Sequence, residues 1–171
     1  MTLTPSIPEL TSQEAEALQF LLPLSADYPH LQSWYLTKVV PGIRLGTRHM
    51  IRLERDGQLA GLGIAKAEDE LKICTVRIAP NFAGRGMGVR LFDGLLHWLG
   101  VDDPHLTVTE QRMPLFERIF DWYGFQQTSV RSGVYRPCIH EFGYNETFRM
   151  TDATVCQKQS ELCPQSRLLA K

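Results

Sequence analysis

Three glycines stand at alternate positions in the run Ile78–Gly88, at Gly84, Gly86 and Gly88. The missing Cβ atoms allow the backbone to approach a ligand closely at these positions. The run leads into an apolar, periodic segment that predicts a helix, and the first N–H groups of a helix carry partial positive charge. Such converging amides bind phosphate or pyrophosphate, and Arg85 would add a cation at the rim. The spacing therefore predicts a phosphate-binding loop, with a tight structural turn as the alternative.

Two widespread phosphate loops are excluded by the pattern. The spacing here is GxGxG, which differs from the dinucleotide fingerprint GxGxxG, and no acidic residue follows at the ribose distance. The GK[ST] ending of the nucleotide-triphosphate loop is absent as well.

The elements around the loop have to position it. Residues 71–79 alternate in hydropathy and predict a strand before the loop, and residues 89–99 predict the helix after it. Upstream, residues 49–54 and 58–66 predict two strands joined by a hairpin turn at Arg55-Asp56-Gly57. The loop thus joins the third strand to a helix.

The N-terminal segment is expected to be mostly helical. Residues 5–10 predict a short strand, and Thr11 with Glu14 three residues later forms a capping-box pattern that opens a helix. A second helix is predicted over residues 31–40, stopped by Pro41-Gly42.

The C-terminal half predicts further strands around one helix. Residues 106–110 predict a strand and residues 114–123 a helix that Gly124 ends. Residues 125–131 and 134–142 predict a closing hairpin. The whole pattern indicates a mixed α/β (α+β) domain.

Composition limits the class of protein. The chain has 171 residues, 43% hydrophobic and 22% charged, which suits one globular domain over residues 1–145 with a polar, flexible tail over 146–171. A formal net charge of −1 argues against a duplex nucleic-acid partner. A local basic patch stays open at four nearby arginines, Arg44, Arg48, Arg52 and Arg55.

The predictions for localisation and metal binding rest on signals that the sequence lacks. No apolar run approaches the roughly 20 residues that span a bilayer, and the N-terminus lacks a signal-peptide pattern, so we expect a cytoplasmic protein without membrane contact. The cysteines are scattered without a CxxC pair, so we expect reduced thiols and no metal site.

The strands over 49–66, the Ile78-x-Pro80 step, the glycine loop and the later Gly124-Phe125 together resemble the GNAT N-acetyltransferase superfamily, over roughly residues 5–142. Its loop pattern is Gln/Arg-x-x-Gly-x-Gly/Ala. Gly86 and Gly88 match the glycine positions, whereas Ala83 stands where the family has Gln or Arg.

The resemblance implies a fold with a mixed, mostly antiparallel central sheet flanked by helices, a strand–glycine loop–helix crossover, and acetyl-CoA as the coenzyme. Backbone groups of Val76, Arg77 and Ile78 would bind the pantetheine arm. Amides of the loop would bind the pyrophosphate, those of Gly84, Arg85, Gly86, Met87, Gly88 and Val89. The implied activity is transfer of an acetyl group to a primary amine by direct attack in a ternary complex.

Acyl transfer to an amine needs a base, donors for the oxyanion and a proton for the leaving thiolate. The Ile78 N–H could polarise the thioester carbonyl. The family commonly has a tyrosine as the acid four residues before its Gly-Phe, where this chain has Phe120. Tyr123 could substitute for it, with a packing role as the alternative, or a water could protonate the sulfur. Glu110, at the end of its strand, is the candidate base, with a solvated or capping carboxylate as the alternative.

The acceptor is left open by the sequence. In this family the first two helices and the closing hairpin recognise it, and aromatic residues gather there at Tyr28-Pro29-His30, Trp34-Tyr35 and Tyr135-Arg136. An amine-bearing small molecule or protein is expected, and a homodimer stays open. Two alternative functions remain: an acyl-CoA-binding regulatory module without turnover, and a toxin-like enzyme that acetylates aminoacyl-tRNA.

Overall fold

The computed structural model describes residues 9–146. The predicted strand over 5–10 lies almost wholly outside this range, and Glu9 and Leu10 belong to no strand. The predicted tail also lies outside it, apart from Glu146. The chain divides into two compact units, unit 1 up to Pro104 and unit 2 from His105 onward. Each unit is described by itself, and the domain boundary at 145 stays a prediction.

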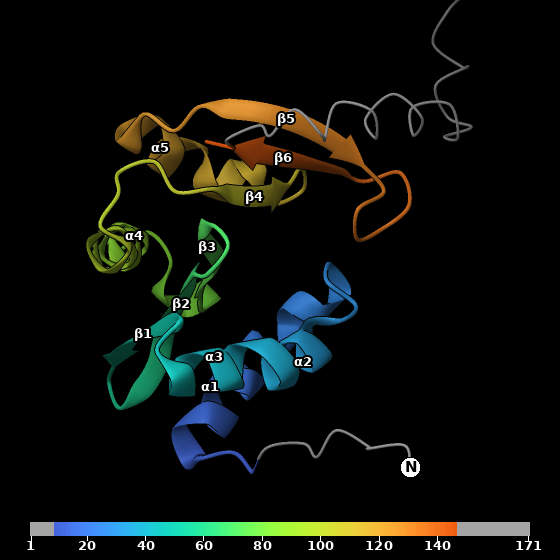
Figure 1. Cartoon of the computed structure of the whole chain (residues 1–171). Coiled ribbons are helices and arrows are strands. Elements are labelled where there is room, and N and C mark those ends of the chain that lie inside the picture. The colour runs from blue at the N-terminus through green and yellow to red at the C-terminus, as the bar shows by residue number, and fades with distance from the viewer. Residues whose placement is uncertain (1–8, 147–171) are drawn as a thin grey trace, which may run out of the picture. The chain divides into compact units, whose positions relative to one another are not determined.

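Unit 1 contains a three-stranded antiparallel sheet in the order β1-β2-β3 (Figure 1). The strands are β1 (Arg48–Arg55), β2 (Gln58–Ala67) and β3 (Leu71–Ile78), which confirms the three predicted strands. Asp56 and Gly57 both have positive φ, 52° and 71°, as the two central residues of a tight hairpin turn require. β3 therefore lies at an edge of this sheet.

The first helix begins as the capping box predicts. α1 (Ser12–Leu21) has the Thr11 hydroxyl accepting from the Glu14 amide, while the Glu14 carboxylate accepts from the Thr11 amide. A 3-10 turn, η1 (Leu22–Ala26), follows it.

The second helix is longer than predicted, because Pro41 does not stop it. Helical residues continue through α2 (Leu31–Trp34), the π-helical turn η2 (Tyr35–Val39) and α3 (Val40–Leu45). The Val40 amide donates to the Tyr35 carbonyl five residues back, so the turn before Pro41 is widened. A widened turn relieves the clash that a proline ring makes with the preceding turn of an α-helix. Gly46, with φ of 77°, ends the segment.

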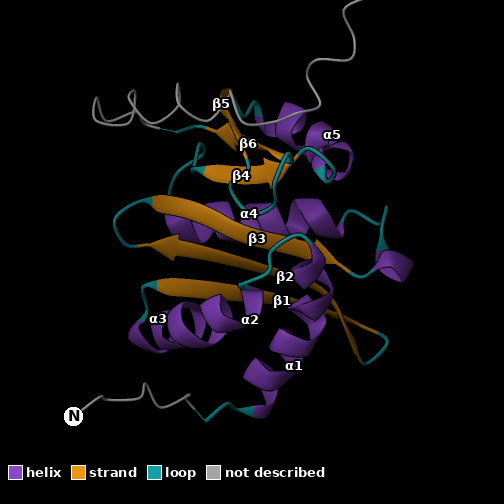
Figure 2. Ribbon diagram, turned by 90° about the vertical axis from the view of Figure 1, so that its right-hand side faces the viewer, coloured by secondary structure: helices purple, strands orange, loops and turns teal. Residues whose placement is uncertain are grey.

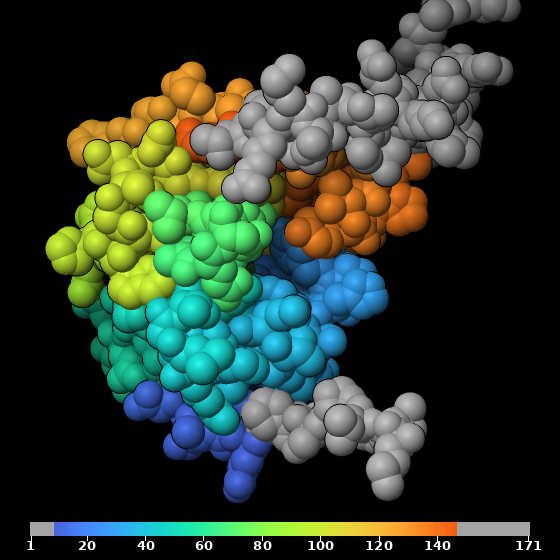
Figure 3. Space-filling view, in the orientation of Figure 1, coloured from blue at the N-terminus to red at the C-terminus, as the bar shows by residue number. Residues whose placement is uncertain are grey.

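Helices cover both faces of this sheet (Figure 2). On one face, Leu62 and Ile64 of β2 pack with the buried residues of α1 to α3. On the other face, Gly61 and Gly63 lie under α4 (Met87–Leu99), and a Cβ at Gly63 would come within 2.9 Å of Leu95 Cδ1. Figure 3 shows the blue-to-green segments of unit 1 packed closely on the visible face. Unit 1 is therefore a three-layer α/β/α body.

Unit 2 pairs one helix with a second antiparallel sheet in the order β4-β6-β5. It consists of β4 (Leu106–Thr109), α5 (Met113–Tyr123), β5 (Gln127–Ser132) and β6 (His140–Tyr144). The mixed α/β fold class with antiparallel strands is thus confirmed. The strands form two three-stranded sheets, one in each unit.

The closing hairpin has a longer connection than predicted. β6 begins at His140 instead of residue 134, because the chain between the strands contains Pro137, which lacks an amide donor, and Cys138, whose φ is 60°. Cys74 is a free thiol. Over the described range, no helix has the length and apolarity to cross a membrane.

Candidate functional site

The outer edge of β3 presents backbone groups from alternate residues. The Ala79 amide donates to the Ala60 carbonyl at 2.8 Å, and the register continues without a bulge as far as the pair Ile64 and Thr75. In an antiparallel ladder, backbone groups alternate between facing the partner strand and facing away from it. Arg77 therefore bonds toward β2, and the N–H and C=O groups of Val76 and Ile78 point away from it. Of the three predicted pantetheine-binding residues, the structure directs these two to the edge.

The Arg77 side chain contacts the first helix. Its guanidinium lies over the ring of Phe20 in α1, 4.4 Å from the ring centroid. This is cation–π distance. Arg77 therefore ties the edge strand to the first helix.

The glycine loop begins with a 3-10 turn, η3 (Pro80–Phe82), and runs into α4. Gly84 and Gly86 have φ of 75° and 71°, and nothing lies within 4 Å of a Cβ built on either one. Both positions need glycine for the backbone turn, and both leave open space above the backbone. The turn and the predicted ligand approach are thus compatible.

The start of α4 is suited to an anion. Gly86 is its N-cap residue and supplies no side-chain hydrogen bond to the amides of the first turn, which contains no acidic residue. The helix dipole is therefore not offset by a carboxylate in this turn. Arg85, which is exposed, lies over the Phe82 ring at 5.9 Å and adds positive charge beside the loop.

Buried apolar residues anchor the loop from beneath. Phe82 and Met87 are 6% and 1% exposed and pack with Ala60 of β2. Gly88 is also buried in the first turn of α4. The two ends of the loop are thus held to the sheet, while Gly84 to Gly86 stay exposed. The buried residues therefore anchor the exposed part of the loop to the sheet.

Glu110, the candidate base, lies beside His140. The Glu110 amide donates to the His140 carbonyl at 2.9 Å, and His140 Nδ1 lies 2.9 Å from Glu110 Oε2. The two side chains are 37% and 47% exposed. No spacing along the chain links His140 to Glu110, which lies 30 residues away.

Phe120, at the usual tyrosine position, is a core residue of unit 2. It is 3% exposed, and its ring contacts Phe125 and Tyr144 at centroid distances of 5.6 and 4.7 Å. Tyr123, the candidate acid, stacks on Phe125 at 5.4 Å and is half-buried.

Tyr144 is a second tyrosine next to Phe120, and the sequence analysis did not consider it. Its hydroxyl donates to Met113 Sδ at 3.4 Å, and burial raises its pKa. A buried hydroxyl against a thioether fits a structural role better than proton transfer.

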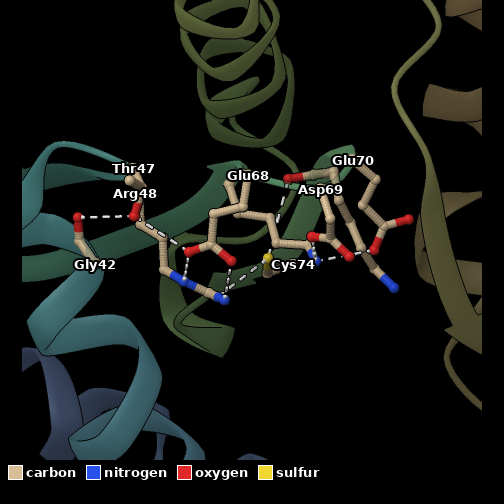
Figure 4. A network of polar contacts seen from close by, with 9 residues as sticks. Gly42, Thr47, Arg48, Glu68, Asp69, Glu70 and Cys74 are labelled. Carbon is tan, nitrogen blue, oxygen red and sulfur yellow. Dashed lines mark hydrogen bonds and ion pairs between the residues drawn. The ribbon is translucent and has the colours of Figure 1, made fainter.

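The acidic turn after β2 is largely exposed, and its carboxylates also form ion pairs (Figure 4). The buried Arg48 guanidinium contacts Glu68 through Nε at 3.0 Å and through Nη2 at 3.2 Å. Asp69 and Glu70 both contact Lys66. Gly42 makes room for this arginine, because a Cβ there would lie 2.6 Å from Arg48 Cδ.

The neighbouring arginines are neutralised in the same way. Arg44 contacts Glu14 at 2.7 Å, and Arg52 contacts Glu16 and Glu54. Three of the four arginines that left a basic patch open are therefore paired with carboxylates. The arginines over 44–55 do not form an uncompensated basic surface.

The aromatic acceptor candidates have different environments. Tyr35 is fully buried, its hydroxyl donates to the Glu14 carbonyl at 2.9 Å, and burial raises its pKa to about 12. Trp34 is half-buried. His30 stands at the start of α2, but its side chain does not cap the helix. Tyr135 is in an exposed loop instead of a strand. Within residues 9–146, no group of three or more His, Cys, Asp or Glu side chains could hold a metal ion.

Comparison with known families and structures agrees with this architecture. A family model described as an acetyltransferase (GNAT) domain matches residues 35–135. No curated protein matches the chain by sequence.

Several solved structures share the fold at low identity. A protein from Desulfovibrio desulfuricans assigned to the GNAT acetyltransferases is 15% identical, with a TM-score of 0.62 over 79% of this chain and 92% of its own. An aminoglycoside 6'-N-acetyltransferase complexed with coenzyme A is 9% identical, with a TM-score of 0.59 over 83% and 98%. The ribosomal-protein-S18-alanine N-acetyltransferase of Escherichia coli is 16% identical, with a TM-score of 0.54 over 84% and 95%.

Proposed function

Since the chain belongs to the GNAT acetyltransferases, we propose that it is an acetyl-CoA-dependent N-acetyltransferase that acylates a primary amine by direct attack in a ternary complex. The observation that carries the proposal is the conjunction, in unit 1, of an open strand edge with an exposed glycine loop at a helix N-terminus. Structural relatives with coenzyme A bound support the choice of coenzyme.

The coenzyme is assigned to backbone groups. Val76 and Ile78 would hydrogen-bond the pantetheine arm along the edge of β3, much as a further strand would. The exposed amides between Gly84 and Val89 would take the pyrophosphate, with Arg85 at the rim. Because backbone groups supply these contacts, Ala83 at the usual Gln/Arg position removes one side-chain contact and leaves the rest in place.

The chemistry is a nucleophilic substitution at the thioester. The amine nitrogen forms a bond to the acetyl carbonyl carbon, and the carbon–sulfur bond breaks. The amine loses a proton to the base, for which Glu110 is the candidate. The leaving thiolate takes a proton from Tyr123 or from water, because a thiolate is a good leaving group. The Ile78 amide is the candidate donor to the oxyanion.

The acceptor class is an amine on a small molecule or a protein. Relatives with this fold are named for aminoglycosides and for a ribosomal protein, and at such low identity they do not discriminate between these acceptors. The carboxylate pairing of Arg44, Arg48 and Arg52 gives no support to an aminoacyl-tRNA acceptor.

Calorimetric titration of the purified chain with acetyl-CoA, followed by turnover assays over a panel of amines, tests the proposal. We expect saturable coenzyme binding, turnover with at least one amine, and loss of turnover in Glu110→Gln with binding retained. Glu117→Gln, an exposed carboxylate of α5, is the matched control. Absence of coenzyme binding would refute the proposal, whereas binding without turnover on any amine would favour the regulatory module.

A further inference from the structure

Glu110 and His140 are brought together by the sheet of unit 2. Thr109 of β4 pairs with Glu141 of β6, and the Glu110 amide extends this ladder to the His140 carbonyl. Glu110 and His140 therefore stand opposite each other, one position beyond the last paired residues. Directly opposite residues of an antiparallel pair have their side chains on the same face. The backbone thus aligns the two side chains before they interact.

The contact between the side chains has a defined direction. His140 Nδ1 lies 2.9 Å from Glu110 Oε2, and an ionised carboxylate only accepts hydrogen bonds. Nδ1 is therefore the protonated nitrogen of the neutral ring, and Nε2 carries the lone pair. About half of the His140 side chain is exposed, so this nitrogen belongs to a ring that a substrate can reach.

The strand register defines the neighbours of His140 on β4, β5 and β6. From the end of β4 it faces Glu110, and across the ladder on β5 its partner is Ser132, which carries no charge. Its neighbour in β6, Glu141, is buried and projects to the opposite face of the sheet by strand alternation.

We propose that Glu110 and His140 act as one proton-accepting pair, in which His140 Nε2 takes the proton and Glu110 orients the ring. The inference rests on the proposed N-acetyltransferase function and deepens it. As the acceptor nitrogen bonds to the acetyl carbon and the thiolate leaves, the proton on nitrogen passes to Nε2. The imidazolium is then stabilised by the Glu110 carboxylate and returns its proton to solvent after product release.

The variant His140→Asn distinguishes the proposed pair from Glu110 acting as the base alone. The Asn amide can still donate to Glu110 but cannot accept a proton, so it keeps the carboxylate in place. We expect kcat to fall roughly 100-fold in His140→Asn and in Glu110→Gln, with the double variant no worse than either single one. Acetyl-CoA affinity should be unchanged in His140→Asn.

The control is Glu117→Gln, which we expect to stay within twofold of the parent. If His140→Asn keeps kcat within about threefold, Glu110 is the base alone and the pair is refuted.

The orienting role can be measured without turnover. Nitrogen-15 NMR of the histidine-labelled full chain should show His140 as the Nδ1–H tautomer, shifting toward Nε2–H in Glu110→Ala. An unchanged tautomer ratio would overturn the inference. If the tautomer shifts but no amine is acetylated, the proposed function fails while the orienting contact stands, so the two failures are distinguishable.

Discussion

The two regions assigned to acetyl transfer are built in different ways. The coenzyme region of unit 1 consists of backbone groups at the edge of β3 and in the loop around Gly86. The proton-transfer region of unit 2 consists of side chains, Glu110 and His140 on the sheet and Tyr123 at the end of α5. A backbone region depends on conformation and tolerates many side chains, whereas a side-chain region fails when one residue changes.

This difference explains the two departures from the family pattern. Ala83 lacks a side chain in a region where, under the proposal, backbone groups would bind the coenzyme. Phe120 lacks a hydroxyl in a region where side chains would transfer protons, and its ring is part of an aromatic core. The first departure should have little consequence, and the second transfers the acid role to another group.

The largest expected effect tests whether the loop acts through its conformation. Gly86 and Gly100 cap the two ends of α4, both with positive φ and open space at the Cβ position. Replacement of either by alanine should lower the free energy of unfolding by about 1 kcal/mol. Only Gly86→Ala should weaken acetyl-CoA binding, by roughly 100-fold, because two hydrogen bonds to a charged phosphate of about 1.5 kcal/mol each are disturbed.

Calorimetric titration and denaturant unfolding of both variants measure this. Equal coenzyme affinity in Gly86→Ala and Gly100→Ala would show that the loop is only a structural turn.

The next effect tests the side-chain region. Tyr123→Phe should reduce kcat by about 10- to 30-fold without a change in acetyl-CoA affinity, less than a full general-acid contribution because water can protonate a thiolate. Tyr144→Phe is the matched control, since its hydroxyl contacts only a thioether in the described structure. Steady-state assays with the best amine of the panel measure both variants, and equal rates would assign the proton to water.

A smaller effect tests the alternation along β3. Val76→Pro removes an amide that points away from β2, and should weaken acetyl-CoA binding roughly fivefold to tenfold with little loss of stability. Arg77→Pro removes an amide of the ladder and should destabilise unit 1 by about 3 kcal/mol. Thermal unfolding and acetyl-CoA titration of both variants distinguish the loss of binding from the loss of stability. Similar destabilisation by both prolines would contradict the assigned alternation.

The smallest expected effect concerns the ion pair between Arg44 and Glu14. Its loss should leave coenzyme binding and turnover unchanged. The hydrogen bond from Arg44 lowers the pKa of Glu14, so the pair stabilises the fold above the ordinary titration range of glutamate, and that contribution is lost as the pH falls below it. Arg44→Gln should lower the free energy of unfolding slightly at pH 7, because the pair is partly exposed to solvent. The difference from the parent should shrink below about pH 4. A difference that stays constant with pH, in denaturant unfolding, would contradict this origin.

Local sequence determined much of the fold. The Thr11 and Glu14 capping box, the Asp56-Gly57 turn and the alternation of β3 each depend on neighbours within a few residues, so they could be predicted without the structure. The stop at Pro41 could not be judged this way, because a π-helical turn widens the helix before the proline. Likewise, the start of β6 at His140 could not be read from the alternating pattern, because Pro137 and the positive φ of Cys138 interrupt the strand.

For the candidate site, the sequence by itself determined the glycine loop. Glycine is the residue type that adopts positive φ at little cost and lets the backbone approach a ligand closely. Only the tertiary structure decided which β3 amides face outward, since that parity depends on the register with β2. It alone placed His140 opposite Glu110, because strand pairing joins residues that no sequence spacing relates. The tertiary structure also showed that Arg44, Arg48 and Arg52 are each paired with a carboxylate. Most of these carboxylates belong to other elements, and Glu54 stands two residues further along β1.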